Sequence, residues 1–501
     1  MEASLVGEVS QREKDDSRAS SGIAGLDDIL GGGFPRNRLY LVQGDPGAGK
    51  TTLALQFLMA GADRGERVLY VSLSESREEI LQVAASHGWN MDNVDIHEYT
   101  PGDQLQEQLP TTVFHPAEME LGETVRGLLD AVEQAQPQRA VFDSLSELML
   151  LASDPLRYRR EILSLKHYFA GRDCTVMLLD DLTTGGGDRQ LHSLCHGVLA
   201  LSDSTQDYGA ARNRIRVTKL RGVRFRGGYH DYVIRTGGLE VFPRLVANEF
   251  ASDFAAKQIE SGVSELDALL GGGLDVGTST LLLGPSGCGK STIATRYVMA
   301  AVEAGEKAAM FLFEESPAVL FQRSKSLSMD LQEYVKSGLL SIQSIDPAEL
   351  APNEFVKHVQ DAVEKDGART IVIDSLNGYL NAMPGERYLF LQLHEMLTYL
   401  AKHAVTTILV SSQQGMLASA PAPGLDVSYI ADTVILFRYF EHAGSVRQAL
   451  SVMKRRSGAH ERTIRELTLG GEAGIAISEP LRGFRGILSG VPIYEREKTE
   501  G

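Results

Sequence analysis

The chain has few cysteines, no long apolar run and a deficit of basic residues. Its three cysteines, Cys174, Cys195 and Cys288, show no spacing typical of a disulfide framework, which fits a reducing cytoplasm. We find no apolar run long enough to cross a bilayer and no signal peptide, so we expect neither membrane insertion nor secretion. Lys and Arg number 49 against 66 Asp and Glu, a net charge of −17. That balance disfavours extensive nonspecific contact with nucleic acid, because such binding depends on neutralising phosphates.

What the sequence does contain, twice, is a phosphate-binding motif. Residues 44–51 read GDPGAGKT and residues 284–291 read GPSGCGKS, and both match G-x-x-x-x-G-K-[ST]. Each follows an apolar stretch typical of a strand, Arg38–Gln43 or Thr280–Leu283, and precedes a predicted helix. The glycines let successive backbone N–H groups curl around phosphate oxygens at the positive end of that helix. The sequence therefore predicts two sites for a nucleoside triphosphate.

Each loop supplies side chains with different expected roles. We expect Lys50 and Lys290 to reach the β and γ phosphates, and the hydroxyls of Thr51 and Ser291 to hold Mg²⁺. Two glycine-rich turns with exposed lysines are the alternative, which the strand and helix context disfavours. Cys288 is interpreted as a small residue that fits the loop rather than as an acidic thiol. The predicted nucleotide-binding residues are Gly44, Asp45, Gly47, Ala48, Gly49, Lys50, Thr51, Thr52, Gly284, Ser286, Gly287, Cys288, Gly289, Lys290, Ser291 and Thr292.

The two loops belong to a longer repeat. Residues 21–33 (SGIAGLDDILGGG) recur as residues 261–273 (SGVSELDALLGGG), and the offset of 261 − 21 = 240 equals the 290 − 50 = 240 between the two lysines. A period of this length indicates two whole domains rather than a solenoid, and 501 residues exceed what one core usually organises. We expect a disordered segment at 1–20, a first domain at 21–247, a second domain at 248–485 and a flexible tail at 486–501.

Strand and helix patterns alternate along the first domain, and the second domain repeats the plan. Near-continuous apolar strands separated by helices predict a parallel sheet covered on both faces. After Val198 the strands shorten and glycine turns appear, so we expect an antiparallel extension of the sheet. The fold class is therefore α/β. The predicted elements are strands at Val68–Leu73, Arg139–Phe142 and Thr175–Leu179, and helices at Arg77–His87, Leu121–Gln136 and Pro155–Arg172.

Acidic residues at strand ends can complete a phosphoryl-transfer site. Asp143 and Asp374 end apolar strands, where a carboxylate can hold the Mg²⁺ shell beside the phosphates. Glu75, and the pair Glu314 and Glu315, follow a strand at the same distance from each loop. A carboxylate there can orient or deprotonate the attacking group. These glutamates could instead favour the dipole at a helix start, but their recurrence favours the catalytic interpretation.

Basic residues on late strands are candidates for balancing charge on the γ phosphate. Beyond the loop lysines, neither repeat has an obvious cation close in sequence. Lys219 and Arg221 in the first repeat, and Lys454 and Arg456 in the second, could be supplied by a neighbouring subunit. The basic stretch at 212–226 could be a solvated strand or one that faces a subunit, and we favour the second interpretation.

The order of these motifs resembles that of the KaiC family of tandem RecA-like ATPases. The shared order is SG-x-x-x-LD-x-(I/L)LGGG, the phosphate loop, a strand ending in Glu, Asp-Ser-Leu and K-x-R, and it covers about Ser20 to about Pro492. The resemblance implies two RecA-like domains in a double-ring homohexamer, with ATP and Mg²⁺ between subunits. It also implies slow hydrolysis in the first ring and phosphorylation of hydroxyls in the second. Family members serve in circadian oscillators or in timing and stress roles.

Two departures from the family pattern affect the expected chemistry. Ser74 stands where the family has the first of two glutamates, which leaves Glu75 as the carboxylate of the first ring. Ser428 matches the first of two adjacent phosphoacceptor hydroxyls, whereas Tyr429 replaces the second. The oxygen of a tyrosine lies well away from the place of a threonine hydroxyl. We therefore expect autophosphorylation at Ser428 rather than at Tyr429.

We expect a cytoplasmic ATPase with serine autokinase activity, and two alternatives from other classes remain open. One is a nucleotide-gated scaffold whose tail at 482–501 binds a regulatory protein. The other is a DNA-dependent recombinase or helicase of the same fold. The acidic balance and the absence of a recognisable DNA-binding module disfavour the latter, and stimulation of ATPase activity by single-stranded DNA would distinguish it.

Overall fold

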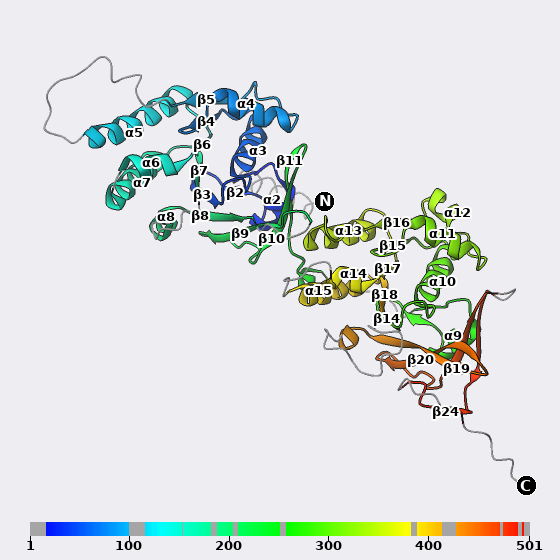
Figure 1. Cartoon of the computed structure of the whole chain (residues 1–501). Coiled ribbons are helices and arrows are strands. Elements are labelled where there is room, and N and C mark those ends of the chain that lie inside the picture. The colour runs from blue at the N-terminus through cyan, green and yellow to red at the C-terminus, as the bar shows by residue number, and fades with distance from the viewer. Residues whose placement is uncertain are drawn as a thin grey trace, which may run out of the picture. The chain divides into compact units, whose positions relative to one another are not determined.

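The chain folds into two α/β units of the same topology (Figure 1). The units comprise residues 1–244 and 245–501, and the division lies beside the predicted boundary at 247/248. This architecture confirms the predicted α/β class and the tandem arrangement. The computed structural model describes residues 17–99, 116–152, 154–181, 188–203, 209–250, 257–381, 388–412, 427–470, 474–488 and 493–494.

Within the described residues, the first unit is built on a nine-stranded sheet. The six strands from β8 to β5 are parallel, and β9, β10 and β11 extend the sheet in antiparallel fashion, as predicted. The central strands are buried along their length, which explains their near-continuous apolar sequence. In spatial order the strands are β11 (Gly238–Phe242), β10 (His230–Arg235), β9 (Asn213–Leu220), β8 (Gly197–Ser202), β3 (Leu39–Gly44), β7 (Thr175–Asp181), β6 (Arg139–Asp143), β4 (Val68–Ser72) and β5 (Asp95–Glu98).

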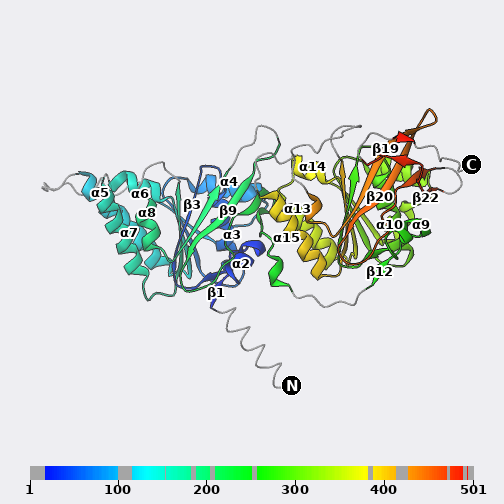
Figure 2. The same ribbon diagram turned by 90° about the horizontal axis from the view of Figure 1, so that it is seen from below.

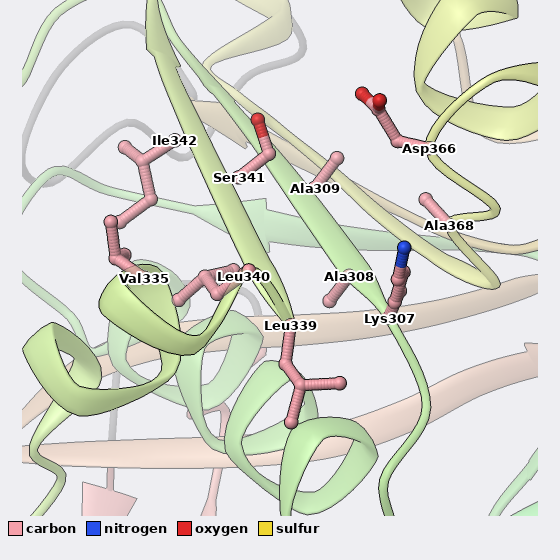
Figure 3. Close-up of a pocket in the computed structure, with 11 residues that line it drawn as sticks. Lys307, Ala308, Ala309, Val335, Leu339, Leu340, Ser341, Ile342, Asp366 and Ala368 are labelled. Carbon is pink, nitrogen blue, oxygen red and sulfur yellow. The ribbon is translucent and has the colours of Figure 1, made fainter.

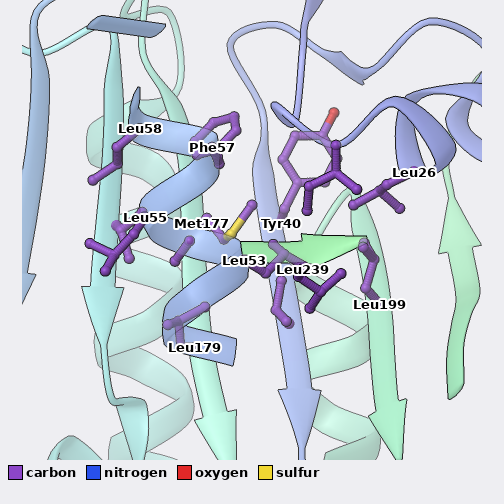
Figure 4. Close-up of a cluster of buried hydrophobic side chains, with 14 of the residues drawn as sticks. Leu26, Tyr40, Leu53, Leu55, Phe57, Leu58, Met177, Leu179, Leu199 and Leu239 are labelled. Carbon is purple, nitrogen blue, oxygen red and sulfur yellow. The ribbon is translucent and has the colours of Figure 1, made fainter. Parts of the chain in front are cut away.

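Helices cover both faces of this sheet (Figure 2). The group α2 to α4 lies on one face and the group α5 to α8 on the other. Apolar side chains of α3, among them Leu53 and Phe57, pack against Tyr40, Met177 and Leu199 of the sheet (Figure 4). The helices are α2 (Ala24–Leu30), α3 (Lys50–Ala62), α4 (Arg77–Ser86), α5 (Pro116–Ala135), α6 (Leu145–Ala152), α7 (Pro155–Phe169) and α8 (Asp188–Leu194).

The second unit repeats the arrangement on its own nine-stranded sheet, again counted over the described residues. Here the strands from β16 to β19 are parallel and β20 to β22 are antiparallel. In spatial order they are β16 (Leu340–Ser344), β15 (Ala308–Leu312), β17 (Thr370–Asp374), β18 (Thr406–Ser412), β14 (Ser279–Gly284), β19 (Thr433–His442), β20 (Ser445–Arg455), β21 (Arg465–Leu469) and β22 (Ile475–Pro480). The helices are α9 (Ser264–Leu269), α10 (Lys290–Glu303), α11 (Pro317–Lys325), α12 (Leu331–Ser337), α13 (Pro352–Glu364), α14 (Leu376–Asn381) and α15 (Leu389–Lys402), with 3₁₀ turns η1 (Ala247–Glu249) and η2 (Val427–Tyr429).

Residues 17–20 are folded, although the sequence prediction placed them in a disordered segment. Strand β1 (Arg18–Ala19) pairs with β2 (Phe34–Pro35), and the side chain of Ala19 is fully buried. Arg18 also donates a hydrogen bond of 3.0 Å to the carbonyl of Gly33. Residues 17–20 are therefore part of the first unit, whereas residues 1–16 lie outside the described residues. The second unit has the equivalent pair β12 (Gln258–Ile259) and β13 (Leu274–Asp275).

The start of the predicted flexible tail is folded. Strand β23 (Phe484–Arg485) pairs with β24 (Ile493–Tyr494), and Ile487 between them is buried at 1% exposure in a cluster with Phe440 and Ala449. The rings of Phe484 and Tyr494 lie 5.2 Å apart. The prediction was wrong here because three apolar side chains in a glycine- and charge-rich stretch are enough to anchor it. Residues 495–501 lie outside the described residues.

Two candidate nucleotide sites

Both phosphate loops lie where a central strand leads into a helix. Strand β3 runs into the first loop and α3 follows it, and β14 and α10 have the same relation to the second loop. The residue before each helix is left-handed, with φ of 85° at Gly49 and 97° at Gly289. A Cβ would lie 2.6 Å from Ile234 Cδ1 at the first position and 2.9 Å from Leu467 Cδ2 at the second. Only glycine therefore allows the turn, which directs backbone N–H groups toward a place suited to anions.

In the first loop, the lysine is held by its own loop and by a carboxylate. Lys50 Nζ donates to the carbonyls of Gly44 and Asp45, both at 3.0 Å. It also pairs with Asp181 Oδ1 at 2.7 Å. The sheet register explains this ion pair, because Gly44 at the end of β3 lies beside Asp181 at the end of β7. An incoming phosphate would compete with Asp181 for the lysine.

In the second loop, the lysine forms no ion pair with a carboxylate in the part of the chain that the structure describes. Lys290 Nζ donates to the carbonyls of Gly284 at 2.9 Å and Pro285 at 2.5 Å. The same register places Gly284 beside Ser412, which has no charge to offer. Burial lowers the pKa of Lys290. Burial also raises the pKa of the Cys288 thiol, in keeping with a small packed residue.

A hydroxyl and a buried carboxylate meet beside the first loop. Thr51 Oγ1 donates to Asp143 Oδ2 at 2.9 Å, and the Tyr70 hydroxyl donates to the same oxygen at 2.5 Å. Burial raises the pKa of Asp143, and the hydrogen bonds from Tyr70 and Thr51 partly oppose that effect. A desolvated carboxylate beside a hydroxyl fits a hard cation such as Mg²⁺, whose charge would favour the ionised form.

The second site has the same pair. Burial raises the pKa of Asp374, and a hydrogen bond with Ser291 opposes that effect. Among the described residues, no group of three or more His, Cys, Asp or Glu could hold a metal by itself. One carboxylate and one hydroxyl per site fit an ion that takes its remaining ligands from phosphates and water.

The first site also contains the carboxylate of Glu75, which is partly buried. It follows β4 and precedes α4, whose first turn is fixed by a capping box between Ser76 and Glu79. Among the described residues, Glu75 Oε2 is buried without a hydrogen-bond partner. Burial raises the pKa of Glu75, and the charges of Asp143 and Glu79 raise it further. A carboxyl in this environment holds a proton more readily than an exposed one does.

The two glutamates of the second site have different partners. Glu314 Oε1 accepts a hydrogen bond of 2.6 Å from the hydroxyl of Ser375, the residue after Asp374. Glu315 instead forms a two-point ion pair with Arg323, with Arg323 Nη2 to Glu315 Oε2 at 2.7 Å and Arg323 Nε to Glu315 Oε1 at 3.1 Å. The structure therefore distinguishes two carboxylates that the sequence treated alike.

Comparison with known proteins covers both units. The family model for the KaiC ATPase matches residues 19–246 and again residues 259–482. The chain belongs to the KaiC family of ATPases. It is 28% identical over 493 residues to the circadian clock oscillator protein KaiC of Picosynechococcus sp., covering 95% of this chain and 93% of that protein. It is 25% identical over 484 residues to the circadian clock protein KaiC3 of Synechocystis sp., covering 95% of each.

The late-strand cations of the KaiC pattern make contacts within their own units. Lys219 Nζ donates to the carbonyls of His192 and Cys195, at the end of α8, and Arg221 Nη2 donates to that of Ser193 at 3.0 Å. Burial and the charge of Arg221 lower the pKa of Lys219. Supply of these cations to a neighbouring subunit stays a prediction.

The second unit repeats these contacts at the segment of the predicted phosphoacceptor. Lys454 Nζ donates to the carbonyls of Ser428 at 3.0 Å and Ala431 at 2.7 Å. Arg456 Nη2 donates to the carbonyl of Tyr429 at 2.5 Å. Both cations thus fix the backbone of η2 and its flank, on which Ser428 lies. A phosphate on Ser428 would therefore lie on a segment whose backbone carbonyls two cations contact.

Ser428 and Tyr429 differ in exposure. Ser428 is partly buried, whereas Tyr429 is 57% exposed and its ring lies 4.9 Å from that of Phe390. Ser428 has the shorter side chain and is the less exposed of the two residues. Of the acceptor segment predicted from the sequence, Asp426 lies outside the described residues.

Four site residues were missed in the sequence. Ser375 follows Asp374 directly in the repeated Asp-Ser-Leu motif, so a signal was present. Tyr70 and Asp181 reach the site through the sheet register, and Arg323 reaches Glu315 from the next helix. No motif marks those three.

The basic stretch at 212–226 engages residues of the same unit. Arg214 pairs with Asp231 at 3.6 Å, and the guanidinium of Arg216 lies 5.0 Å from the ring centroid of Tyr229. Arg214 and Arg216 alternate with buried residues along β9 and so share one face, where the ion pair with Asp231 neutralises the charge of Arg214.

A pocket of the second unit lies away from the phosphate loop. It has a volume of about 390 Å³ and borders β15 and β16, with Lys307, Leu339 and Asp366 among its lining residues (Figure 3). It lies at the opposite end of β15 from Glu314 and Glu315.

Among the described residues, no helix combines the length and apolar character that a bilayer span needs.

Proposed function

We propose that this KaiC-family ATPase forms a double-ring homohexamer that hydrolyses ATP in its first domain and phosphorylates its own Ser428 in its second. The observation that carries most weight is the unequal state of the glutamates: among the described residues Glu75 Oε2 has no hydrogen-bond partner, whereas Glu314 and Glu315 are held by Ser375 and Arg323. Two sites of one fold with different carboxylate environments suit two different reactions. We extend the proposal to a timing or stress-signalling role, which the names of the related circadian clock proteins support.

In the first site, hydrolysis would use Glu75 as the base. A water molecule attacks the γ phosphorus, its proton passes to the carboxylate of Glu75, and the bond to the β–γ bridging oxygen breaks to leave ADP. Lys50 would exchange Asp181 for the β and γ phosphates. Thr51 and Asp143 would hold Mg²⁺, which neutralises developing charge when bound.

In the second site, the attacking group would be the hydroxyl of Ser428. Glu314, oriented by Ser375, would accept the hydroxyl proton as the new oxygen–phosphorus bond forms and ADP leaves. Assembly into a ring would bring this acceptor to the site of a neighbouring subunit, since ATP is expected between subunits. Lys454 and Arg456 fix the acceptor segment by its backbone.

The test is incubation of the full-length protein with γ-labelled ATP and Mg²⁺, following both released phosphate and label on the protein. We expect both products from the wild type, and loss of protein label but not of phosphate release from Ser428→Ala. Tyr429→Phe is the matched control and should keep its label. Label that persists in Ser428→Ala would contradict the assignment of the acceptor. Sedimentation velocity should show hexamers with ATP, and monomers at saturating ATP would contradict the ring.

A scaffold that binds a regulatory protein is the second candidate. The observation in its favour is that Ile493 and Tyr494 on the short strand β24 are 60% and 58% exposed. Phosphate release without any protein label would favour this candidate. A pull-down with ATP- and ADP-bound protein, comparing Ile493→Ser with the wild type, would then test the strand as a binding surface.

A further inference from the structure

The guanidinium of Arg323 joins the second site's glutamate to its phosphate-loop helix. Arg323 lies on α11 and binds both oxygens of Glu315, at 2.7 and 3.1 Å. Its third nitrogen, Nη1, donates to Thr292 Oγ1 on α10 at 3.1 Å. The side chains of Arg323 and Glu315 are 25% and 23% exposed, so the pair is largely shielded from water. A shielded two-point pair is among the stronger ionic contacts a protein makes.

The first site lacks this arginine. The offset of 240 that relates Glu75 to Glu315 and Thr52 to Thr292 places Val83 at the position of Arg323. The intervening strand end, turn and helix start have the same length in both units, and both helices are capped by a serine hydroxyl. Val83 can offer neither charge nor hydrogen bond, and Glu75 Oε2 is indeed without a partner among the described residues.

We propose that Arg323 is a positioning residue that restrains Glu315 and so slows hydrolysis of ATP in the second site. The two charge-assisted hydrogen bonds hold one acceptor position on each oxygen of Glu315 and fix the orientation of its carboxylate, so turning that group toward an attacking water breaks at least one of them. Glu314 is instead oriented by the hydroxyl of Ser375. The second site thereby keeps its ATP for transfer to a hydroxyl instead of losing it to water.

The groups facing this pair are consistent with a restraint built for the site. Asp374 lies close enough for the charges of both Glu315 and Arg323 to act on it. Arg323 therefore also offsets the repulsion among three acidic side chains, Glu314, Glu315 and Asp374, that share one strand-end edge. The first site has Glu75 and Asp143 at that edge, but the arginine of the following helix, Arg77, donates to the carbonyl of Ile96 at 3.0 Å and Val83 stands at the position of Arg323.

The experiment uses the full-length protein with first-site hydrolysis silenced by Glu75→Gln. In that background we expect Arg323→Val to raise kcat for phosphate release about tenfold, a modest part of what a free general base supplies. KM should change less than about twofold, because uniform ATP binding is untouched. Label on Ser428 should fall, since ATP is now lost to water. Arg323→Lys keeps the charge without the two-point geometry, so its kcat for phosphate release should lie between that of the protein with Arg323 and that of Arg323→Val.

The reciprocal change tests the idea without disturbing the second site's fold. Val83→Arg, in a protein whose second site is silenced by Lys290→Ala, should place a guanidinium beside Glu75 and Thr52 and lower kcat about tenfold. Val83→Met is the matched control for bulk and should change kcat little. If the melting curve shows that Arg323→Val fails to fold, the comparison of Val83→Arg with Val83→Met tests the proposal in its place.

The inference rests on the proposed function, and the two can fail separately. An unchanged or lower kcat in Arg323→Val, or equal effects of Val83→Arg and Val83→Met, would overturn the restraint while leaving the ATPase intact. A lower kcat would mean that Arg323 assists the reaction instead. If the unmodified protein releases no phosphate and carries no label, the proposed function is overturned and the restraint falls with it.

Discussion

Replacing Glu75 by Gln tests the role of the first site's carboxylate and its energetic cost together. The substitution keeps the size and shape of the side chain and removes its charge and its capacity to take a proton. A positioned general base contributes about 10²- to 10⁴-fold to a rate, so phosphate release by the first site should fall at least about 100-fold. ATP binding should survive, because the phosphate loop and Lys50 are unchanged.

The same substitution should stabilise the fold at neutral pH. Burial, together with the charges of Asp143 and Glu79, raises the pKa of Glu75 in the folded state. A carboxyl whose pKa is raised by folding contributes stability at low pH that is lost as the pH rises through the folded pKa. At neutral pH the ionised Glu75 is therefore unfavourable. An unsatisfied buried group costs about 1–3 kcal/mol, and we take about 1 kcal/mol because the side chain is partly exposed.

Thermal melting and phosphate release, measured on the same samples, check both parts. A gain of about 1 kcal/mol corresponds to a Tm rise of about 2–4 °C in a domain of this size. The gain should vanish at about pH 4, below the ordinary pKa of Glu, where the wild-type side chain is protonated as well. Glu78→Gln removes an exposed charge three residues further on, in the first turn of α4, and should change neither quantity. Full activity with a lower Tm at neutral pH would refute the reasoning.

Two further substitutions follow from ion pairs in the first unit. Asp181→Asn frees Lys50 from a pair worth about 1 kcal/mol, so the first site should bind ATP about fivefold more tightly, as measured by titration with a fluorescent analogue; weaker binding would mean that Asp181 helps to hold the nucleotide or its metal. Arg139→Met removes a fully buried guanidinium bonded to Glu66 at 2.5 Å. It should lower the free energy of unfolding by about 3 kcal/mol, the lower end for a broken buried pair, because Arg36 still pairs with Glu66; a loss under about 1 kcal/mol in a urea titration would contradict this.

Much of the fold was predictable because both repeats carry the same local signals. The phosphate loops, the strand-end Asp143 and Asp374 and the glycine-rich repeat at 21–33 recur at fixed offsets, so each supports the interpretation of the other. Helix α6 was not predicted, because its sequence LSELMLLA is almost continuously apolar and shows little helical periodicity. The buried Ile487 was missed because three scattered apolar residues in a polar segment give no periodic pattern.

The chemistry of the sites was predictable only where it follows the backbone. The sequence placed the glutamates of both sites but treated Glu315 as the equivalent of Glu75. Their difference depends on residue 323, eight positions further on, and on its third contact with Thr292 across the helix interface. A side chain's partner across two elements depends on packing, which one sequence does not encode in any short motif. A position-by-position comparison of the two repeats would have shown that Val83 stands in the first repeat where Arg323 stands in the second.

The nucleotide that each site retains tests the central claim, that the two sites are chemically unequal, most directly. Protein carrying Lys50→Ala keeps only the second site, and protein carrying Lys290→Ala keeps only the first. Each would also carry Ser428→Ala, so that transfer to the acceptor produces no ADP. Each would be incubated with α-labelled ATP and Mg²⁺, separated from free nucleotide, and its bound label resolved into ATP and ADP. We expect mostly ATP on the Lys50→Ala protein and mostly ADP on the Lys290→Ala protein. Equal proportions on the two proteins, or the reverse order, would contradict the account.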